Sequence, residues 1–263
     1  MGRPYAGICK DMYRLPVIIG AAALVVIVAG ATALAVGLPA SHPAAQAVSA
    51  PADGHATAVL EMTSGTTLLS VRVANLGGTA GTLLRASTPD GAPVRPEARL
   101  VQAGTTDRSG NPEDVVLTLA SSAGRGVGEY AVTVTLNAAV TWRLDFAGGT
   151  QRTAVNLRGG RVASLGFTAG SQIIDVTLPR PHGTVPVLLA GGASQLLLRA
   201  PAGVPVRVTA GGGAGTVSLD GASYTGVAGG SVFASPGWAS AAARYDVEAT
   251  AGAADVSVTG WRG

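Results

Sequence analysis

The hydrophobic pattern divides the chain into one long apolar run and a long stretch of short alternating segments. Residues 16–38 contain 23 positions without a charge. As a helix this run would measure roughly 34 Å, against about 30 Å for the hydrocarbon core of a bilayer. We therefore expect residues 16–38 to form one transmembrane helix, which makes the lipid bilayer a partner of the chain.

Charges on either side of the run predict its orientation. Arg3, Lys10 and Arg14 precede it, and the first basic residue after it is Arg72. Basic residues favour the cytoplasmic side of a membrane. We expect residues 1–15 to be cytoplasmic and the C-terminal part to be extracytoplasmic, in a single-pass plasma-membrane protein.

A cleaved signal peptide is the alternative to this signal-anchor. Residues 48–50, Val-Ser-Ala, have the small side chains of a cleavage site. However, the apolar run exceeds the usual length of about 7–15 residues, and the site lies well beyond its end.

The pattern changes again after the apolar run. Residues 39–57 are rich in Ala and Pro and hold little to bury, which predicts a linker. Later segments such as Val132–Leu136 and Trp142–Phe146 alternate apolar and polar residues, which is typical of half-buried strands. We therefore expect residues 58–263 to form an all-β extracytoplasmic domain.

The strongest pattern in this domain is a repeat in which a glycine separates two alternating strands. Four such glycines are 21, 22 and 21 residues apart, namely Gly149, Gly170, Gly192 and Gly213. A degenerate fifth copy covers residues 244–260. Each glycine permits positive φ and a tight turn, and stacked units would bury one apolar face. This predicts a stacked short-strand β-repeat, a β-solenoid-like fold, with a Greek-key β-sandwich as the alternative.

The alternation also predicts which side chains face the core of the stack. These are Ile174, Val176, Leu178, Leu196, Leu198, Val206, Val208, Val217 and Leu219.

Two segments carry a resemblance to a known family. They are LPRPHGTVPVLLAGGASQLLLRAPAGVPVRV at 178–208 and SPGWASAAARYDVEATAG at 235–252. The chain resembles the toastrack-type "putative adhesin" family of bacterial envelope domains, and these motifs are similar to those of membrane-anchored actinobacterial members. The resemblance is best over residues 131–261 and weaker over residues 58–122. It implies a stacked β-repeat in the cell envelope, in a family that includes domains of envelope-stress regulators, and it implies no chemistry.

Charge and cysteine content exclude several classes of partner and site. Without the N-terminal segment the chain holds 15 Arg and 14 acidic residues, so it is nearly neutral, which argues against a nucleic-acid partner. The single cysteine, Cys9, falls on the expected cytoplasmic side. The domain therefore has neither a disulfide nor a thiolate metal site.

Few residues are candidates for chemistry. His42 and His55 fall in the expected linker, and His182 falls in a turn where the next repeat has Ala202. The acidic segment at 107–114 predicts a solvated hairpin loop, with weak Ca²⁺ binding as the alternative. The sequence thus assigns no catalytic, cofactor-binding or metal-binding residue, and no cofactor.

Aromatic residues could form a sugar-stacking face, but each lies beside a strand or at the end of a repeat, which favours core filling or capping. They are Trp142, Trp238, Trp261, Tyr130, Tyr224 and Tyr245. We expect Pro236–Trp238 to fold over the open end of the stack and cover its edge.

These observations predict a non-enzymatic, membrane-anchored envelope protein that presents a β scaffold to a protein or a cell-wall component, with a role in envelope stress. The alternative is a surface carbohydrate-active hydrolase with paired carboxylates in a groove of the stack. Asp145, Asp175 and Asp220 are the candidates for that pair.

Overall fold

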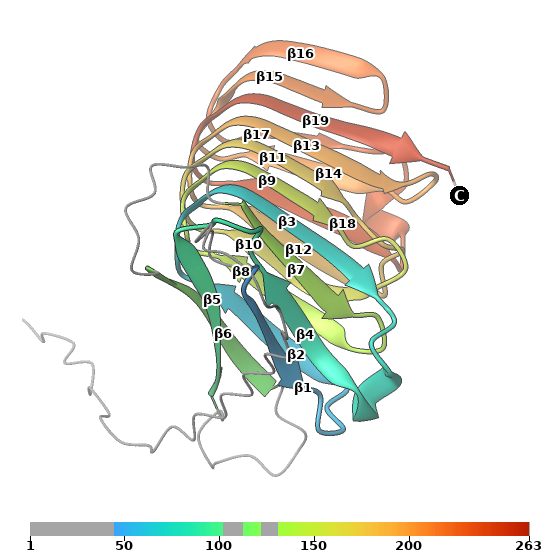
Figure 1. Cartoon of the computed structure of the whole chain (residues 1–263). Coiled ribbons are helices and arrows are strands. Elements are labelled where there is room, and N and C mark those ends of the chain that lie inside the picture. The colour runs from blue at the N-terminus through green and yellow to red at the C-terminus, as the bar shows by residue number, and fades with distance from the viewer. Residues whose placement is uncertain (1–44, 102–112, 122–130, 263) are drawn as a thin grey trace, which may run out of the picture.

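The computed structural model describes residues 45–101, 113–121 and 131–262. Among these residues the regular elements are strands and two short 3-10 helices, η1 (Gly78–Ala80) and η2 (Trp238–Ser240). The strands form two sheets that face each other along the whole stack (Figure 1). The prediction of an all-β domain is confirmed for this part of the chain.

Sheet A has ten strands and sheet B has nine. In spatial order, sheet A contains β1 (Ala47–Pro51), β4 (Thr82–Ser87), β7 (Ala131–Asn137), β3 (Thr66–Ala74), β9 (Thr150–Asn156), β11 (Ser171–Thr177), β13 (Ala193–Pro201), β19 (Ala253–Trp261), β15 (Ala214–Leu219) and β16 (Ala222–Val227). Sheet B contains β17 (Ser231–Ala234), β14 (Val206–Ala210), β18 (Arg244–Ala249), β12 (Thr184–Leu189), β10 (Arg161–Phe167), β8 (Thr141–Phe146), β2 (Thr57–Met62), β6 (Glu113–Ser121) and β5 (Val94–Val101).

The stack consists of layers, each made of one strand of sheet B and the next strand in the chain, which belongs to sheet A. Strands of neighbouring layers run parallel, for example β8 with β10 and β9 with β11. In spatial order the layers are β6–β7, β2–β3, β8–β9, β10–β11, β12–β13, β18–β19 and β14–β15. A Greek-key sandwich would need antiparallel neighbours at these positions, so that alternative is not the observed fold.

The spatial order of the layers departs from their order in the chain. Layer β18–β19, the last in the sequence, lies between layers β12–β13 and β14–β15. Layer β2–β3, the first in the sequence, lies between layers β6–β7 and β8–β9. The fifth copy of the repeat therefore stacks between the third and the fourth.

The core lies between the two sheets and consists of the alternate, inward-facing residues of each strand. All nine residues that the sequence predicted to face inward are buried, and the most exposed of them, Leu219, retains 5% of its surface. Phe146 and Phe167 stack across adjacent layers with ring centroids 5.2 Å apart. The interior is thus filled by side chains of the chain itself.

The glycines at the strand-to-strand corners act differently from the prediction. Gly149, Gly170 and Gly192 do not have positive φ, whereas Gly213 does, at 80°. The neighbouring residue explains the need for glycine, because a Cβ on Gly191 would lie 2.2 Å from the backbone carbonyl of Ala169 in the adjacent layer. Close approach between layers, rather than left-handed backbone, requires glycine at the position before the corner glycine in three copies, namely Gly148, Gly191 and Gly212.

The N-terminal boundary of the domain also differs from the prediction. Residues 47–51 form β1, which pairs antiparallel with β4, and Ala50 and Ala52 are buried. The expected linker over residues 39–57 is therefore wrong from Ala47 onward, because alanines facing a sheet bury well even in a polar context. Residues 16–38 lie outside the described part, and no helix within that part is long and apolar enough to cross a bilayer.

Candidate functional site

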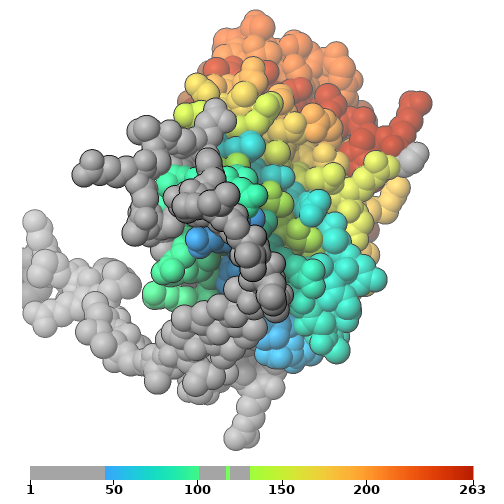
Figure 2. Space-filling model, viewed as in Figure 1, coloured from blue at the N-terminus to red at the C-terminus, as the bar shows by residue number. Residues whose placement is uncertain are grey.

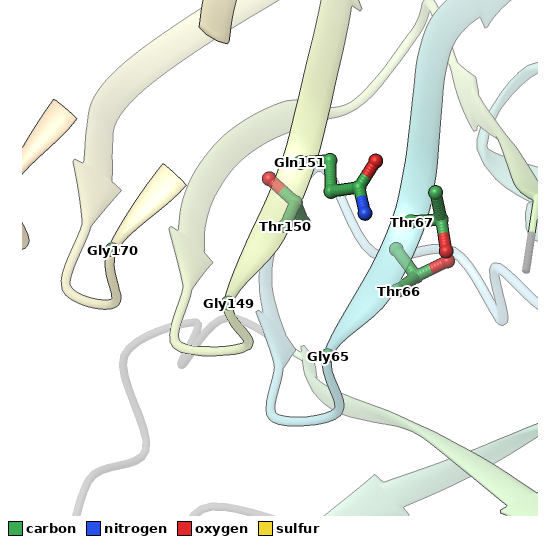
Figure 3. Close-up of a pocket in the computed structure, with 7 residues that line it drawn as sticks. All are labelled: Gly65, Thr66, Thr67, Gly149, Thr150, Gln151 and Gly170. Carbon is green, nitrogen blue, oxygen red and sulfur yellow. The ribbon is translucent and has the colours of Figure 1, made fainter. Parts of the chain in front are cut away.

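An open hollow lies on the glycine corner of three adjacent layers, β2–β3, β8–β9 and β10–β11. Its volume is about 470 Å³. It is lined by Gly65, Thr66, Thr67, Gly149, Thr150, Gln151 and Gly170. In Figure 3 the amide of Gln151 extends from β9 toward the strand that carries Thr67.

Hydroxyl groups repeat at this corner because the residue after the corner glycine is Thr or Ser in three layers. Thr150 Oγ1 lies 2.7 Å from Ser171 Oγ and 2.6 Å from Thr153 Oγ1. Ser171 Oγ also donates to the carbonyl oxygen of Ile173, at 3.3 Å. Most of the exposed lining of the hollow is apolar, with the Gln151 amide and backbone groups among the polar groups beside it. Its lining side chains offer no general acid or base.

The three carboxylates proposed for a hydrolase do not come together. Asp145 lies on sheet B, where it accepts a hydrogen bond from Thr168 Oγ1 at 3.1 Å. Asp175 lies on sheet A and pairs with Arg199, with Nη2 and Oδ2 3.0 Å apart. Asp220 has φ 52° and occupies the tight turn between β15 and β16. The expected carboxylate pair is therefore not formed by any two of these residues.

The structure instead places Glu61 beside Asp145. Glu61 on β2 and Asp145 on β8 are register partners in adjacent parallel strands, and both are partly exposed on the outward face of sheet B. Neither residue lines the hollow. The sequence contains the signal for this neighbour, because LEMTSG at 60–65 aligns with LDFAGG at 144–149 as an earlier copy of the repeat.

The histidine and metal predictions have different outcomes. His182 is exposed in the connection before β12, in agreement with a surface turn, and His55 lies in the turn between β1 and β2. His42 lies outside the described residues, as do residues 107–112 of the acidic segment, so the Ca²⁺ alternative stays untested. Within the described ranges, no three His, Cys, Asp or Glu side chains are placed to hold a metal ion.

Two of the aromatic residues belong to the core, as predicted. Trp142 is fully buried and donates from Nε1 to the carbonyl oxygen of Asn137, at 3.0 Å. Tyr245 is also fully buried, and its hydroxyl donates to the carbonyl oxygen of Pro179 at 2.6 Å. Burial raises the pKa of the Tyr245 phenol above its usual value. Tyr130 lies outside the described residues.

Trp238 has a different role from the one expected. Two guanidinium groups lie over its ring, with Arg207 at 3.9 Å and Arg244 at 4.4 Å from the ring centroid. Its Nε1 donates to the carbonyl oxygen of Tyr245 at 2.7 Å. These contacts fix the loop against β14 and β18, so it does not cover the edge strands β16 and β17. The prediction that this loop caps the stack is wrong, because cation–π contacts with Arg207 and Arg244 hold Trp238 against β14 and β18.

Trp261, at the end of β19, makes the same two kinds of contact as Trp238, a hydrogen bond from Nε1 and a cation–π contact. Its Nε1 donates to the carbonyl oxygen of Leu178 at 3.1 Å, and the Arg158 guanidinium lies 4.2 Å from the ring centroid. Its indole ring is therefore engaged by neighbouring residues of the same domain.

Comparison with known proteins supports the fold and leaves the chemistry open. No protein-family profile matches this chain. No curated protein matches it either. The chain is similar to a crystal structure of a "putative cell adhesion protein" from Clostridium sporogenes, with a TM-score of 0.57 and 14% sequence identity. The likeness covers 84% of this chain and all of the other, which at that identity establishes a shared fold.

Proposed function

We propose that this protein is a non-enzymatic surface scaffold that presents its β stack to a protein or a cell-wall component outside the cell. In this proposal residues 16–38 anchor it in the plasma membrane and residues 1–15 stay in the cytoplasm. The toastrack-type adhesin resemblance and the fold shared with a putative cell adhesion protein favour this class. A link to envelope-stress regulation is part of the same proposal and has the resemblance as its basis.

One observation carries the proposal: the interior of the stack is filled, and the residues that line the open hollow have no ionisable side chain. Among the described residues, 45 hydrophobic side chains are buried. The hollow at the glycine corner offers hydroxyl and amide groups without an ionisable side chain. Such a surface suits reversible recognition of a hydroxyl-rich or peptide ligand, and lacks the groups needed for proton transfer.

Ligand binding at the hollow can be tested with a photo-crosslinking residue at Gln151 of the full chain in intact cells. A matched control carries the same residue at Thr216, which lies on the outward face of sheet A away from the hollow. We expect an adduct with a wall component or an envelope protein from position 151 and little from position 216. Equal labelling from both positions, or none from position 151, would contradict the proposal.

The anchor can be tested separately through cysteine labelling. The native Cys9 should resist a membrane-impermeant maleimide in intact cells, whereas a cysteine at exposed Ser223 in a Cys9→Ser background should react. Reaction of Cys9 in intact cells, or release of the protein into the medium, would overturn the predicted topology.

A hydrolase remains the second candidate, and the neighbouring carboxylates of Glu61 and Asp145 are the observation that favours it. Parallel neighbours lie about 4.8 Å apart, so two carboxylates at this register are close enough to share a substrate. Release of reducing ends from wall glycans by the wild type, lost in Glu61→Gln and Asp145→Asn, would establish this function. We expect no release.

A further inference from the structure

The C-terminal end of the stack has a composition that is unusual for a free sheet edge. Both sheets end there, sheet A at β16 and sheet B at β17. The segment that forms this end, residues 221–234, reads GASYTGVAGGSVFA and contains neither a charged residue nor a proline. Proteins usually place charged residues or proline on an exposed edge strand to prevent it from pairing with another chain. In Figure 2 the orange atoms of this end form the tip of the molecule.

The last layer of the core is also open at this end. Tyr224 is the register partner of Val217, and Phe233 is the register partner of Val208; both valines are fully buried between the sheets. The two rings therefore face inward, and their centroids are 4.5 Å apart. Tyr224 is nevertheless 45% exposed, and Val232, on the outward face of β17, is 58% exposed. Within the described residues no further layer covers this ring pair.

The opposite end of the stack is closed. Its edge strand β5 carries Arg95, Pro96, Glu97 and Arg99. The other edge strand, β1, lies against β5 and ends in a proline. Its Ala50 retains only 4% of its surface exposed. The N-terminal end thus has the charges, prolines and coverage that the C-terminal end lacks. This asymmetry indicates that one end, and not the other, is built for contact.

We propose that the C-terminal end is a self-association surface, on which a second copy of this chain docks through β16 and β17. A two-fold axis perpendicular to both sheets would place β16 of one copy antiparallel to β16 of the second copy in sheet A. The same axis would place the two β17 strands antiparallel to each other in sheet B. One operation then extends both sheets and stacks the two Tyr224–Phe233 pairs face to face. The contact is self-complementary and closed, as in most homodimers.

The charge and proline content of the two ends of the stack favours a second copy, related by a two-fold axis, as the partner at this surface. A head-to-tail contact would place the neutral end against a strand that carries Pro96 and three charges, and proline cannot donate to a sheet ladder. Two neutral ends, in contrast, bring no like charges together and leave no charge unpaired. The two-fold arrangement is the one that satisfies both conditions.

The position of the termini gives this contact a consequence. Ten strands at about 4.8 Å separate β1 from β16 by roughly 43 Å, so the first described residues lie at the far end of each copy (Figure 1). In the two-fold pair these residues point in opposite directions. If each copy is anchored as proposed above, the pair would bridge two membranes. The bridging rests on that proposed function, and the self-association does not.

Self-association is tested on the full chain in detergent, in a Cys9→Ser background. Thr225 lies near the middle of β16, close to the proposed axis, so Thr225→Cys should form a disulfide-linked dimer under mild oxidation, and Arg99→Cys on exposed β5 should not. Light scattering should give the mass of two copies for the wild type. Thr225→Lys with Val232→Lys, both at exposed positions, should raise the dissociation constant at least about tenfold.

A single-copy mass together with no Thr225→Cys crosslink would overturn the proposal. Crosslinking of Thr225→Cys to another protein in cells, with a monomeric purified protein, would assign the edge to a different partner and also overturn it. Clustering of vesicles that contain the full chain then tests bridging alone. Dimers without clustering would refute the anchored geometry and leave the self-association intact.

Discussion

Replacement of Asn137 by alanine should destabilise the domain far more than the same change at Asn156. Asn137 is fully buried at the end of β7. Its Nδ2 donates to the carbonyl oxygens of Gly78 and Thr82, both at 2.7 Å, and its Oδ1 accepts from the backbone N–H of Ala139 at 3.0 Å. The side chain thereby connects η1 and β4 to the end of β7.

The magnitude follows from these three bonds. Truncation removes three hydrogen bonds to backbone groups, although the Gly78 carbonyl keeps the bond from the Gly81 N–H at 3.2 Å. Each lost hydrogen bond costs about 0.5–1.5 kcal/mol, so at the middle of that range the loss is about 3 kcal/mol. For a domain of this size that corresponds to a fall of about 6–12 °C in melting temperature.

Asn156 is the matched control, because it precedes a similar turn but is exposed. Its side chain accepts a single bond, from the backbone N–H of Arg158 at 3.1 Å. We expect Asn156→Ala to cost less than about 1 kcal/mol. Urea unfolding of the two variants, followed by circular dichroism, measures the difference. Equal losses of unfolding free energy would refute the conclusion that the Asn137 side chain holds η1 and β4 against β7.

Two further predictions concern the glycine corners and a buried phenol. Gly191→Ala should cost more than about 2 kcal/mol because its Cβ would lie 2.2 Å from the Ala169 backbone, whereas Gly192→Ala, with its nearest atom at 3.7 Å, should be nearly neutral in urea unfolding. Tyr245→Phe should cost about 1–2 kcal/mol through loss of the bond to Pro179. Because the folded-state pKa of Tyr245 is raised, its stabilising contribution is complete below about pH 10 and declines above it. The stability gap between wild type and Tyr245→Phe should therefore shrink by about 1.4 kcal/mol per unit above pH 10, and a constant gap would contradict burial of the phenol.

Local features of the fold could be predicted from the sequence because they depend on alternation alone. Ile174 and Val176 face inward because the strand period of two puts alternate residues on one face, and the nearest apolar surface is the facing sheet. The order of the layers could not be predicted in this way. Layers β12–β13, β14–β15 and β18–β19 are copies of the same repeat, so the repeat pattern does not specify which of them are neighbours.

Features that depend on distant contacts were missed or misassigned. Asn137 gives no local signal, because its partners Gly78 and Thr82 lie far away in the sequence. Residues 47–51 read as linker because alanine and proline bury well only when a partner strand, here β4, is present. The position of Trp238 has no local signal either, because the guanidinium groups of Arg207 and Arg244 contact its ring only in the folded domain.

The inserted position of layer β18–β19 is the central structural claim, and disulfide formation tests it most directly. Gln195 and Asp255 are register partners on the neighbouring strands β13 and β19, about 4.8 Å apart, which suits a disulfide. Gln195 and Thr216 would be neighbours if the layers followed the chain order, but each pairs with Asp255 from opposite sides, so about 9.6 Å separates them. In a Cys9→Ser background we predict rapid bridging of Gln195→Cys with Asp255→Cys and none of Gln195→Cys with Thr216→Cys. The reverse result would contradict the account.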